Sequence, residues 1–149
     1  IDETQEGIPV FSANVFEPFG LINKELLESF DQPSVLWGID GDWMVNYIEK
    51  EKQFYPTDHC GVLRLKGKEV HPRYLAFALD KAGKEVRFSR NHRASIDRIK
   101  GLSIKVPSYE IQLQFAKKVD VLEKKISEAR EILESTKDKK QAILDKYLK

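Results

Sequence analysis

The chain has 149 residues, of which 41% are hydrophobic and 33% are charged, and this composition excludes an intrinsically disordered chain. No apolar run reaches the roughly 20 residues that a membrane helix needs, and the single cysteine, Cys60, excludes a disulfide framework. The formal net charge of +1 combines −8 over residues 1–50, +7 over residues 51–108 and +2 over residues 109–149. We therefore expect a soluble cytoplasmic protein whose basic middle third either binds a polyanion or pairs internally with the acidic first third.

The first part of the chain carries strand signals. Short apolar stretches between turn residues predict strands at residues 8–12, 34–39, 43–48 and 59–65. The sequence Asp40-Gly41-Asp42 predicts a tight turn that joins the second and third of these strands. A short helix is expected from Lys24 to Phe30.

Helix signals dominate the middle of the chain. Pro72 stands at the first position of a predicted helix, and we expect Gly83 to end this helix. Ser95 is expected to cap a short helix at residues 96–100, before a last strand at residues 102–106. Together these elements predict an α+β fold with a mixed or mostly antiparallel sheet, followed by a long C-terminal coiled-coil helix.

The long helix is predicted to begin at Tyr109, capped by Ser108, and to continue for 41 residues without glycine or proline. A heptad pattern defines an apolar seam along it, formed by Phe115, Val119, Leu122, Ile126, Ala129, Leu133, Ile143 and Tyr147. Thr136 and Lys140 weaken the seam near its end. Such a seam needs a second helix, in the same complete protein or in a partner. The alternative is a helix folded back over its own domain, but a length of about 60 Å exceeds the diameter of so small a domain.

Residues that often carry catalysis or hold metals are scattered singly. The three histidines and Cys60 do not have the spacing of a zinc site. His59 and Cys60 are adjacent on a predicted strand, so their side chains point to opposite faces. The sequence also has no glycine-rich phosphate-binding loop. We therefore expect no metal, no cofactor and no catalytic activity.

A strongly basic segment follows the predicted helix that ends at Gly83. Between residues 84 and 105, seven Lys and Arg side chains stand against two acidic ones, and four of the seven are Arg. Arg can bind guanine and Asn can bind adenine in the major groove of duplex DNA, while hydroxyls and short helix N-termini bind phosphates. A solvated charged surface is the alternative interpretation, but the bias of sign favours nucleic acid.

Six stretches in a fixed order resemble the specificity subunits of type I restriction-modification enzymes. They are Gly7-Ile-Pro-Val-Phe-Ser, Val35-Leu-Trp-Gly-Ile-Asp-Gly, Phe54-Tyr-Pro-Thr-Asp-His, Val70-x-Pro-x-Tyr-Leu, Leu102-Ser-Ile-Lys-Val-Pro-Ser-Tyr-Glu-x-Gln and the coiled-coil helix. The resemblance covers nearly the whole chain and implies one target recognition domain, residues 1–107, and one spacer helix, residues 108–149.

The sequence departs from the family pattern in two places. The usual strand before the Ile-Pro-Val segment is absent, which favours truncation or a disordered start, and the chain begins without methionine, as a fragment would. A fragment and a natural half-subunit both stay open. Asp40 and Asp42 stand where many relatives carry a basic or small residue, which weakens the case for a DNA contact by that turn.

The resemblance implies a non-catalytic function. In that family each recognition domain reads one part of a split DNA site in the major groove, and antiparallel spacer helices fix the distance between two such domains. Methylation subunits that bind S-adenosylmethionine dock on this scaffold, and a restriction subunit that uses ATP can join them. The implied partners are therefore double-stranded DNA, these subunits, and a second recognition domain or a second copy of the chain.

Two other functions compete with this one. The chain could be an assembly adaptor that acts through its coiled-coil helix and binds no DNA. It could also be the recognition domain of a solitary methyltransferase, which would need an Asn/Asp-Pro-Pro-aromatic motif that this sequence does not contain.

The candidate DNA contacts fall into three groups. They are Arg90, Asn91, His92 and Arg93 with Arg87 and Lys100 as phosphate contacts, then Ser12 and Asn14, and then Lys52, Tyr55 and Thr57. A structural turn at residues 55–58 is the alternative for the third group. Trp37 is expected in the core, and Trp43 either in the core or as a stacking platform.

Overall fold

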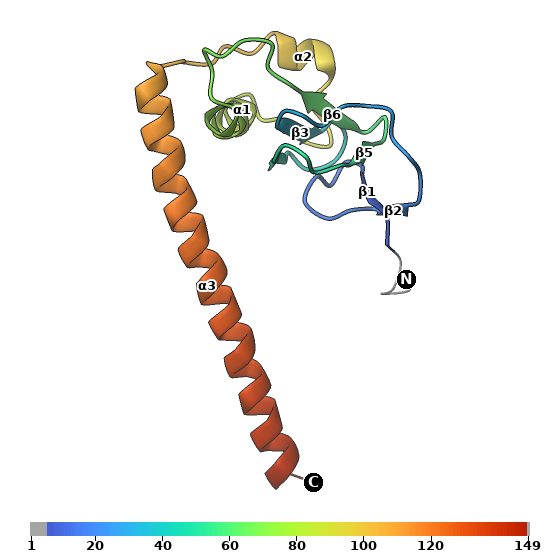
Figure 1. Cartoon of the computed structure of the whole chain (residues 1–149), viewed down its shortest axis with the longest axis vertical. Helices are drawn as coiled ribbons and strands as arrows, with labels where there is room; N and C mark the ends of the chain where they lie inside the picture. Colours follow the sequence, from blue (N-terminus) through green and yellow to red (C-terminus); the bar gives the residue numbers. More distant parts are fainter. Residues whose placement is uncertain (1–5, 149) are drawn as a thin grey trace. The chain divides into compact units, whose positions relative to one another are not determined.

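The computed structural model describes residues 6–148. In chain order its elements are β1 Ile8–Phe11, β2 Gly20–Ile22, β3 Ser34–Gly38, β4 Val45–Ile48, β5 Tyr55–Pro56, β6 Cys60–Leu63, α1 Pro72–Glu85, α2 Ile96–Lys100 and α3 Tyr109–Tyr147 (Figure 1). The chain divides into two compact units, the first ending at Gln112 and the second beginning at Leu113. These elements confirm the predicted α+β class.

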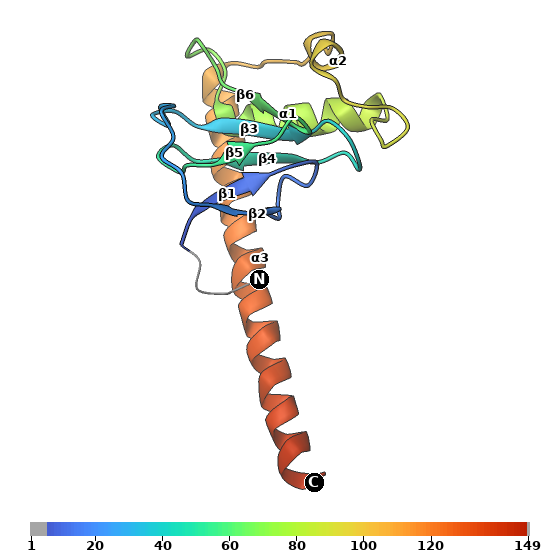
Figure 2. The same cartoon turned by 90° about the vertical axis from the view of Figure 1, so that its right-hand side faces the viewer.

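The first unit contains two small sheets (Figure 2). In one sheet, β1 lies between β2, to which it is antiparallel, and β5, to which it is parallel. In the other sheet, β3 lies between β4 and β6 and is antiparallel to both. The strands β2 and β5 were not predicted, because three and two residues are too few to show an alternating pattern.

Strand β3 is the centre of this unit because both of its faces are buried. Its alternating side chains place Val35 and Trp37 on one face and Leu36 on the other. The first face packs against the buried residues Leu75, Ala76, Leu79, Phe88, Ala94 and Ile99. The second face packs against Phe11, Val15, Phe30, Phe54 and Cys60. The turn that follows β3 is therefore carried on a strand that is held from both sides.

Trp37 lies in the core, as predicted, and its ring explains why position 61 is a glycine. Trp37 is paired with Gly61 across β3 and β6 and is only 3% exposed. A Cβ at Gly61 would lie 2.2 Å from the indole ring of Trp37, so only glycine leaves room for the ring.

Helix α1 begins as predicted and ends later than predicted. Pro72 occupies its first turn, and the side chain of His71 caps it. The prediction that Gly83 ends this helix is wrong, because the helix continues to Glu85. Gly83 instead makes room for Trp43, whose ring would lie 2.1 Å from a Cβ at that position.

The C-terminus of α1 is closed by Arg87, which has a left-handed backbone conformation with φ 59°. The amide of Arg87 donates to the carbonyl of Lys84 at 3.1 Å, and the amide of Phe88 donates to the carbonyl of Gly83 at 3.0 Å. This pair of bonds is the Schellman motif, in which glycine usually takes the left-handed position. The chain turns sharply there, and Phe88 enters the core.

The helix predicted from Lys24 to Phe30 is absent, and this segment is irregular. Phe30 is buried and contacts Phe54 edge to face, with 5.4 Å between ring centroids. Glu28 forms an ion pair with Arg64. A helix of seven residues has little stability of its own, so these tertiary contacts decide the conformation.

The strand predicted at residues 102–106 is also absent. Leu102 and Ile104 pack against the first core, which accounts for the alternating pattern. The carbonyl of Lys105 accepts a hydrogen bond from the Tyr74 hydroxyl at 2.8 Å. The segment is therefore held by side chains and not by pairing with another strand.

The two predicted caps in the last third of the chain are confirmed. The Oγ atom of Ser95 accepts from the amide of Arg98 at 3.3 Å, and the Oγ atom of Ser108 accepts from the amide of Ile111 at 3.4 Å. The first turn of α3 is also anchored by Gln112, whose buried side chain forms three hydrogen bonds of 2.8–3.1 Å, with the amide of residue 71 and the carbonyls of residues 69 and 107.

The second unit is the remainder of α3, a helix of 39 residues in total. Most of its apolar seam is exposed: Leu122 by 57%, Ile126 by 51% and Leu133 by 54%. None of the helices in the described part of the chain is long and apolar enough to cross a membrane.

Candidate DNA interface

The segment after α1 forms a tight hairpin that carries Arg90 and Asn91 at its tip. Ser89 and His92 pair with each other, and the amide of each donates to the carbonyl of the other at 3.0 Å. The ring of His92 stacks on buried Phe88 with 5.3 Å between the centroids. The tip residues are exposed, so two predicted DNA contacts project from a fixed backbone.

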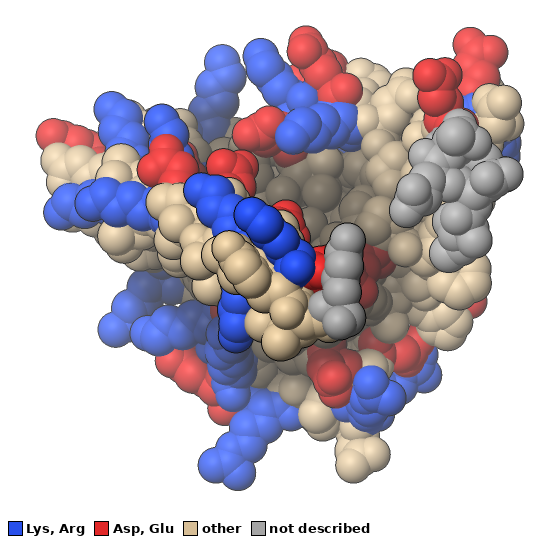
Figure 3. All heavy atoms as spheres, turned by 90° about the horizontal axis from the view of Figure 1, so that it is seen from below, with Lys and Arg blue, Asp and Glu red and all other residues tan. Residues whose placement is uncertain are grey.

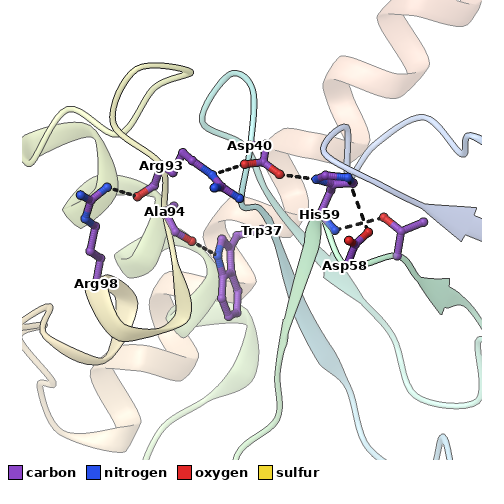
Figure 4. Close-up of polar contacts among 8 residues, drawn as sticks. Trp37, Asp40, Asp58, His59, Arg93, Ala94 and Arg98 are labelled. Carbon is purple, nitrogen blue, oxygen red and sulfur yellow. Dashed lines mark hydrogen bonds and ion pairs between the residues drawn. The ribbon is translucent and has the colours of Figure 1, made fainter.

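This hairpin is joined to the turn that follows β3. The amide of Ala94 donates to the carbonyl of Ile39 at 3.1 Å, and its carbonyl accepts from Nε1 of Trp37 at 2.8 Å (Figure 4). The carbonyl of Arg93 accepts from Nη1 of Arg98 at 2.7 Å. The backbone around Arg93 is therefore fixed from both sides by the core and by α2.

Two aspartates of the β3–β4 turn pair with two arginines of the hairpin segment. The Nε atom of Arg90 lies 3.1 Å from Oδ1 of Asp42, and Nε of Arg93 contacts Oδ1 of Asp40. The hydrogen bond to Asp42 raises the pKa of Arg90. The arginine side chains stay 74% and 60% exposed. The acidic and basic thirds of the chain thus pair internally here, but the guanidinium groups still face solvent.

Asp40 has a second basic partner, His59. Its Oδ2 atom contacts Nδ1 of His59, and Nε2 of His59 lies 3.5 Å from a carboxylate oxygen of Asp58. The hydrogen bond to Asp40 raises the pKa of His59, and the same bond, together with Arg93, lowers the pKa of Asp40. Charges of alternating sign therefore extend from Asp58 to Arg93 (Figure 4).

The loop after β1 joins the same edge of the unit. The hydroxyl of Thr57 donates to Oγ of Ser12 at 3.2 Å and accepts from the amide of His59 at 3.2 Å. The carbonyl of Ala13 would lie 2.3 Å from a Cβ at Gly38, so this loop presses on the end of β3. We call the segments that meet here, residues 12–14, 39–42, 57–59 and 88–93, the polar rim.

The structure brings the three groups of predicted DNA contacts together only in part. The rim contains Arg90 to Arg93, Ser12, Asn14 and Thr57, while Asn14 uses its side-chain oxygen to accept from two amides of its own loop at 3.0 Å each. Lys52 follows β4 at the opposite end of the β3 sheet and pairs with Glu49 at 3.2 Å. Tyr55 is half of the short strand β5. The predicted phosphate contacts Arg87 and Lys100 are both exposed.

One basic residue of the middle third has a structural position that its sequence context does not indicate. Arg64 pairs with Glu28, and its Nε donates to Oγ of Ser34 at 2.9 Å. Its guanidinium carbon lies 5.4 Å and 5.8 Å from the ring centroids of Phe30 and Phe54. Charge counting along the sequence therefore overstates the basic surface. Both basic (blue) and acidic (red) side chains are exposed on the side that Figure 3 shows.

Cys60 is buried. Burial raises the pKa of the Cys60 thiol to about 11, so this thiol is protonated at neutral pH. Within residues 6–148, no three His, Cys, Asp or Glu side chains are grouped as a metal site.

Comparison with known proteins finds similarity to DNA specificity proteins. The model of the type I restriction modification DNA specificity domain matches residues 2–136. The chain is also 36% identical over 56 residues to a Mycoplasma pneumoniae protein named as the N-terminus of a type I specificity subunit. This alignment covers 37% of the chain and 30% of the relative, so the chain spans less than a third of the relative's length in it. Because the family model covers most of the sequence, the chain belongs to the family of type I restriction-modification DNA specificity domains.

Proposed function

We propose that the chain reads one part of a split DNA site through the polar rim. Membership of the specificity-domain family supports DNA as the ligand. The observation that carries the proposal is the hairpin that presents Arg90 and Asn91 on a backbone held by the core. Arginine and asparagine at a rigid exposed tip suit base edges in the major groove, because both side chains can bind a base through two hydrogen bonds.

Within this proposal the candidate residues have different roles. Arg90, Asn91 and Arg93 contact base edges, while Arg87 and Lys100 contact phosphates from either side of the hairpin segment. Ser12 and Asn14 extend the contact from the loop after β1. Lys52 follows β4 at the end of the β3 sheet opposite the rim, so any DNA contact by Lys52 would be separate from the rim.

The two parts of the chain divide the work. Residues 1–107 act as the recognition domain, and residues 108–149 act as the spacer helix. The exposed seam supports antiparallel pairing with a second such helix, which fixes the distance between two recognition domains. That second helix belongs to the other half of a specificity subunit or to a second copy of the chain. Methylation subunits dock on this scaffold, and the restriction subunit joins them.

Duplex binding by the full chain, assembled with the methylation subunits of its system, tests the proposal. The affinity should fall log-linearly as salt rises, because phosphate contacts release counterions. Arg93→Ala should weaken binding to the selected site by roughly 1–3 kcal/mol. Lys81→Ala removes an exposed, ion-paired positive charge outside the rim and is the control. If no duplex pool binds even at low salt, the chain is an assembly adaptor and not a DNA reader.

A further inference from the structure

Both arginine–aspartate pairs of the polar rim use the same atom of the guanidinium group. In each pair, the arginine atom that approaches the carboxylate is Nε. Of the five N–H donors of arginine, one is on Nε and four are on the two terminal nitrogens. A carboxylate bound at Nε leaves one outward N–H on each terminal nitrogen. Those two donors are the pair that binds O6 and N7 of guanine in the major groove.

The aspartates themselves are held in place. Asp40 and Asp42 flank Gly41, whose φ of 92° shapes the turn that follows the buried strand β3. Asp40 uses Oδ1 for Arg93 and Oδ2 for His59, so both of its oxygens are fixed. Asp40 is therefore a rigid support for Arg93, whereas Asp42, whose side chain is 67% exposed, is positioned by the backbone of the turn.

A contribution to folding stability does not explain the two arginine–aspartate pairs. The side chains of Arg90 and Arg93 are 74% and 60% exposed, and exposed ion pairs contribute little to folding. Apart from these carboxylates, the guanidinium groups have no polar partner among the residues that the structure describes. What the pairs do is bias two arginine side chains toward one orientation before binding, which lowers the entropy lost on recognition.

The carboxylates also add selectivity. Two negative charges near the DNA backbone disfavour every duplex through repulsion, so only a site with well-placed acceptors restores the affinity. A turn with Asp40 and Asp42 is therefore compatible with a DNA-reading surface, although its charge alone argues against one.

We propose that Asp40 and Asp42 are positioning residues that present Arg93 and Arg90 end-on to two guanines of the DNA site. His59 orients Asp40 from its other side. This inference rests on the proposed function and adds to it the bases that the rim reads.

Selection from random duplexes, with the full chain assembled with its methylation subunits, provides the test. In the selected site, each G·C pair is then replaced with A·T and the affinities are compared. We expect two guanine positions at which the wild type discriminates by roughly 5-fold to 100-fold. Arg90→Ala should abolish the discrimination at one position, and Arg93→Ala at the other. The variants Arg90→Lys and Arg93→Lys keep the charge but lose the two-pronged contact, so they should relax the same positions.

The aspartate variants distinguish positioning from simple charge. Asp42→Asn should reduce discrimination at the Arg90 position and leave affinity for random duplexes unchanged or higher, because it removes a repulsive charge. Asp40→Asn should do the same at the Arg93 position. If either variant shifts the affinity for all sequences equally and preserves the ratios, the positioning role is wrong.

The outcomes separate the two proposals. If the wild type selects no sequence at all, the proposed function fails and this inference fails with it. If the wild type selects a site whose guanines are unaffected by the arginine variants, DNA recognition stands and the guanine assignment is wrong.

Discussion

The polar rim and helix α3 expose opposite kinds of side chain. At the rim, charged groups are exposed but already paired, as Arg90 is with Asp42 and Arg93 with Asp40. Along α3, the seam residues Leu122 and Ile126 are apolar and more than half exposed. The rim is therefore arranged before it meets a ligand, whereas the seam becomes stable only when a second surface covers it. The first arrangement suits selective reading, and the second suits assembly.

The largest effect is expected from a substitution at Trp37, in the core that supports the polar rim. Trp37→Ala should lower the free energy of unfolding by about 3–5 kcal/mol, because it leaves a large cavity beside β3. It also removes the hydrogen bond that Nε1 donates to the carbonyl of Ala94. Chemical denaturation monitored by circular dichroism measures the change.

A milder variant separates the two effects of Trp37. Trp37→Phe keeps a ring in the core but loses the indole donor, so it should cost less than Trp37→Ala. Leu27→Ala, at a fully exposed position of the same unit, should change stability very little. If Trp37→Ala were as stable as Leu27→Ala, the core would not be the support of the hairpin.

The seam is tested by placing a charge on it. Leu122→Glu should weaken self-association of the full chain by about 1.5–3 kcal/mol per buried leucine. Val121→Glu is the matched control, since Val121 is 55% exposed and Leu122 is 57% exposed, but only Leu122 lies on the seam. Sedimentation equilibrium measures both. Equal effects of the two glutamates would contradict pairing through this seam. A wild-type chain that stays monomeric at every concentration would rule out a second copy as the partner and leave the other half of a specificity subunit.

The difference between local patterns and long-range contacts explains which features of the fold could be predicted from the sequence. The caps at Ser95 and Ser108 and the uninterrupted helix from Tyr109 follow from local patterns, and the structure confirms them. The false helix at Lys24 and the false strand at residues 102–106 had local patterns too, but contacts with distant residues decided their conformation. A sequence therefore shows which local structures are favoured, but it does not show where contacts between distant residues override them.

The candidate site was predicted in the same partial way. The cluster from Arg90 to Arg93 stood out by composition. Its partners Asp40, Asp42 and His59 lie 31 to 53 positions away along the chain, so nothing local connected them with it. The resemblance to a family even weighed against the aspartates. Their role emerges only from the fold, which brings the β3–β4 turn against the hairpin.

Arg87 lies next to the polar rim and has a strained left-handed backbone conformation. Arg87→Gly should stabilise the unit by about 0.5–1 kcal/mol, since glycine adopts the left-handed conformation at the end of α1 without a side-chain clash. The same change should weaken DNA binding if Arg87 contacts a phosphate. Thermal unfolding and duplex affinity measure the two effects. Arg87→Ala removes the charge without relieving the strain, so it should weaken binding and not stabilise.

The smallest expected effect is a pH dependence at the rim, where His59 is half exposed. The hydrogen bond with Asp40 raises the pKa of His59 above its ordinary value of 6.5, so the protonated form is favoured in the folded state. The stabilisation is therefore fully present below about pH 6.5 and is lost as pH rises through the raised pKa. Because the pKa of Asp40 is lowered from 3.8, its carboxylate stays charged throughout this range.

Urea unfolding of the wild type and of His59→Gln, compared from pH 5 to pH 9, measures this contribution. The wild type should exceed the variant in stability at the acidic end, and the difference should shrink toward the basic end. An NMR titration of the His59 ring gives the midpoint directly, and Asp40→Asn should move it down toward the ordinary value. If the titration midpoint of His59 is the same in Asp40→Asn as in the wild type, the carboxylate of Asp40 does not hold His59. The fixed orientation of Asp40, on which Arg93 depends, would then lose its support, while the seam of α3 would be unaffected.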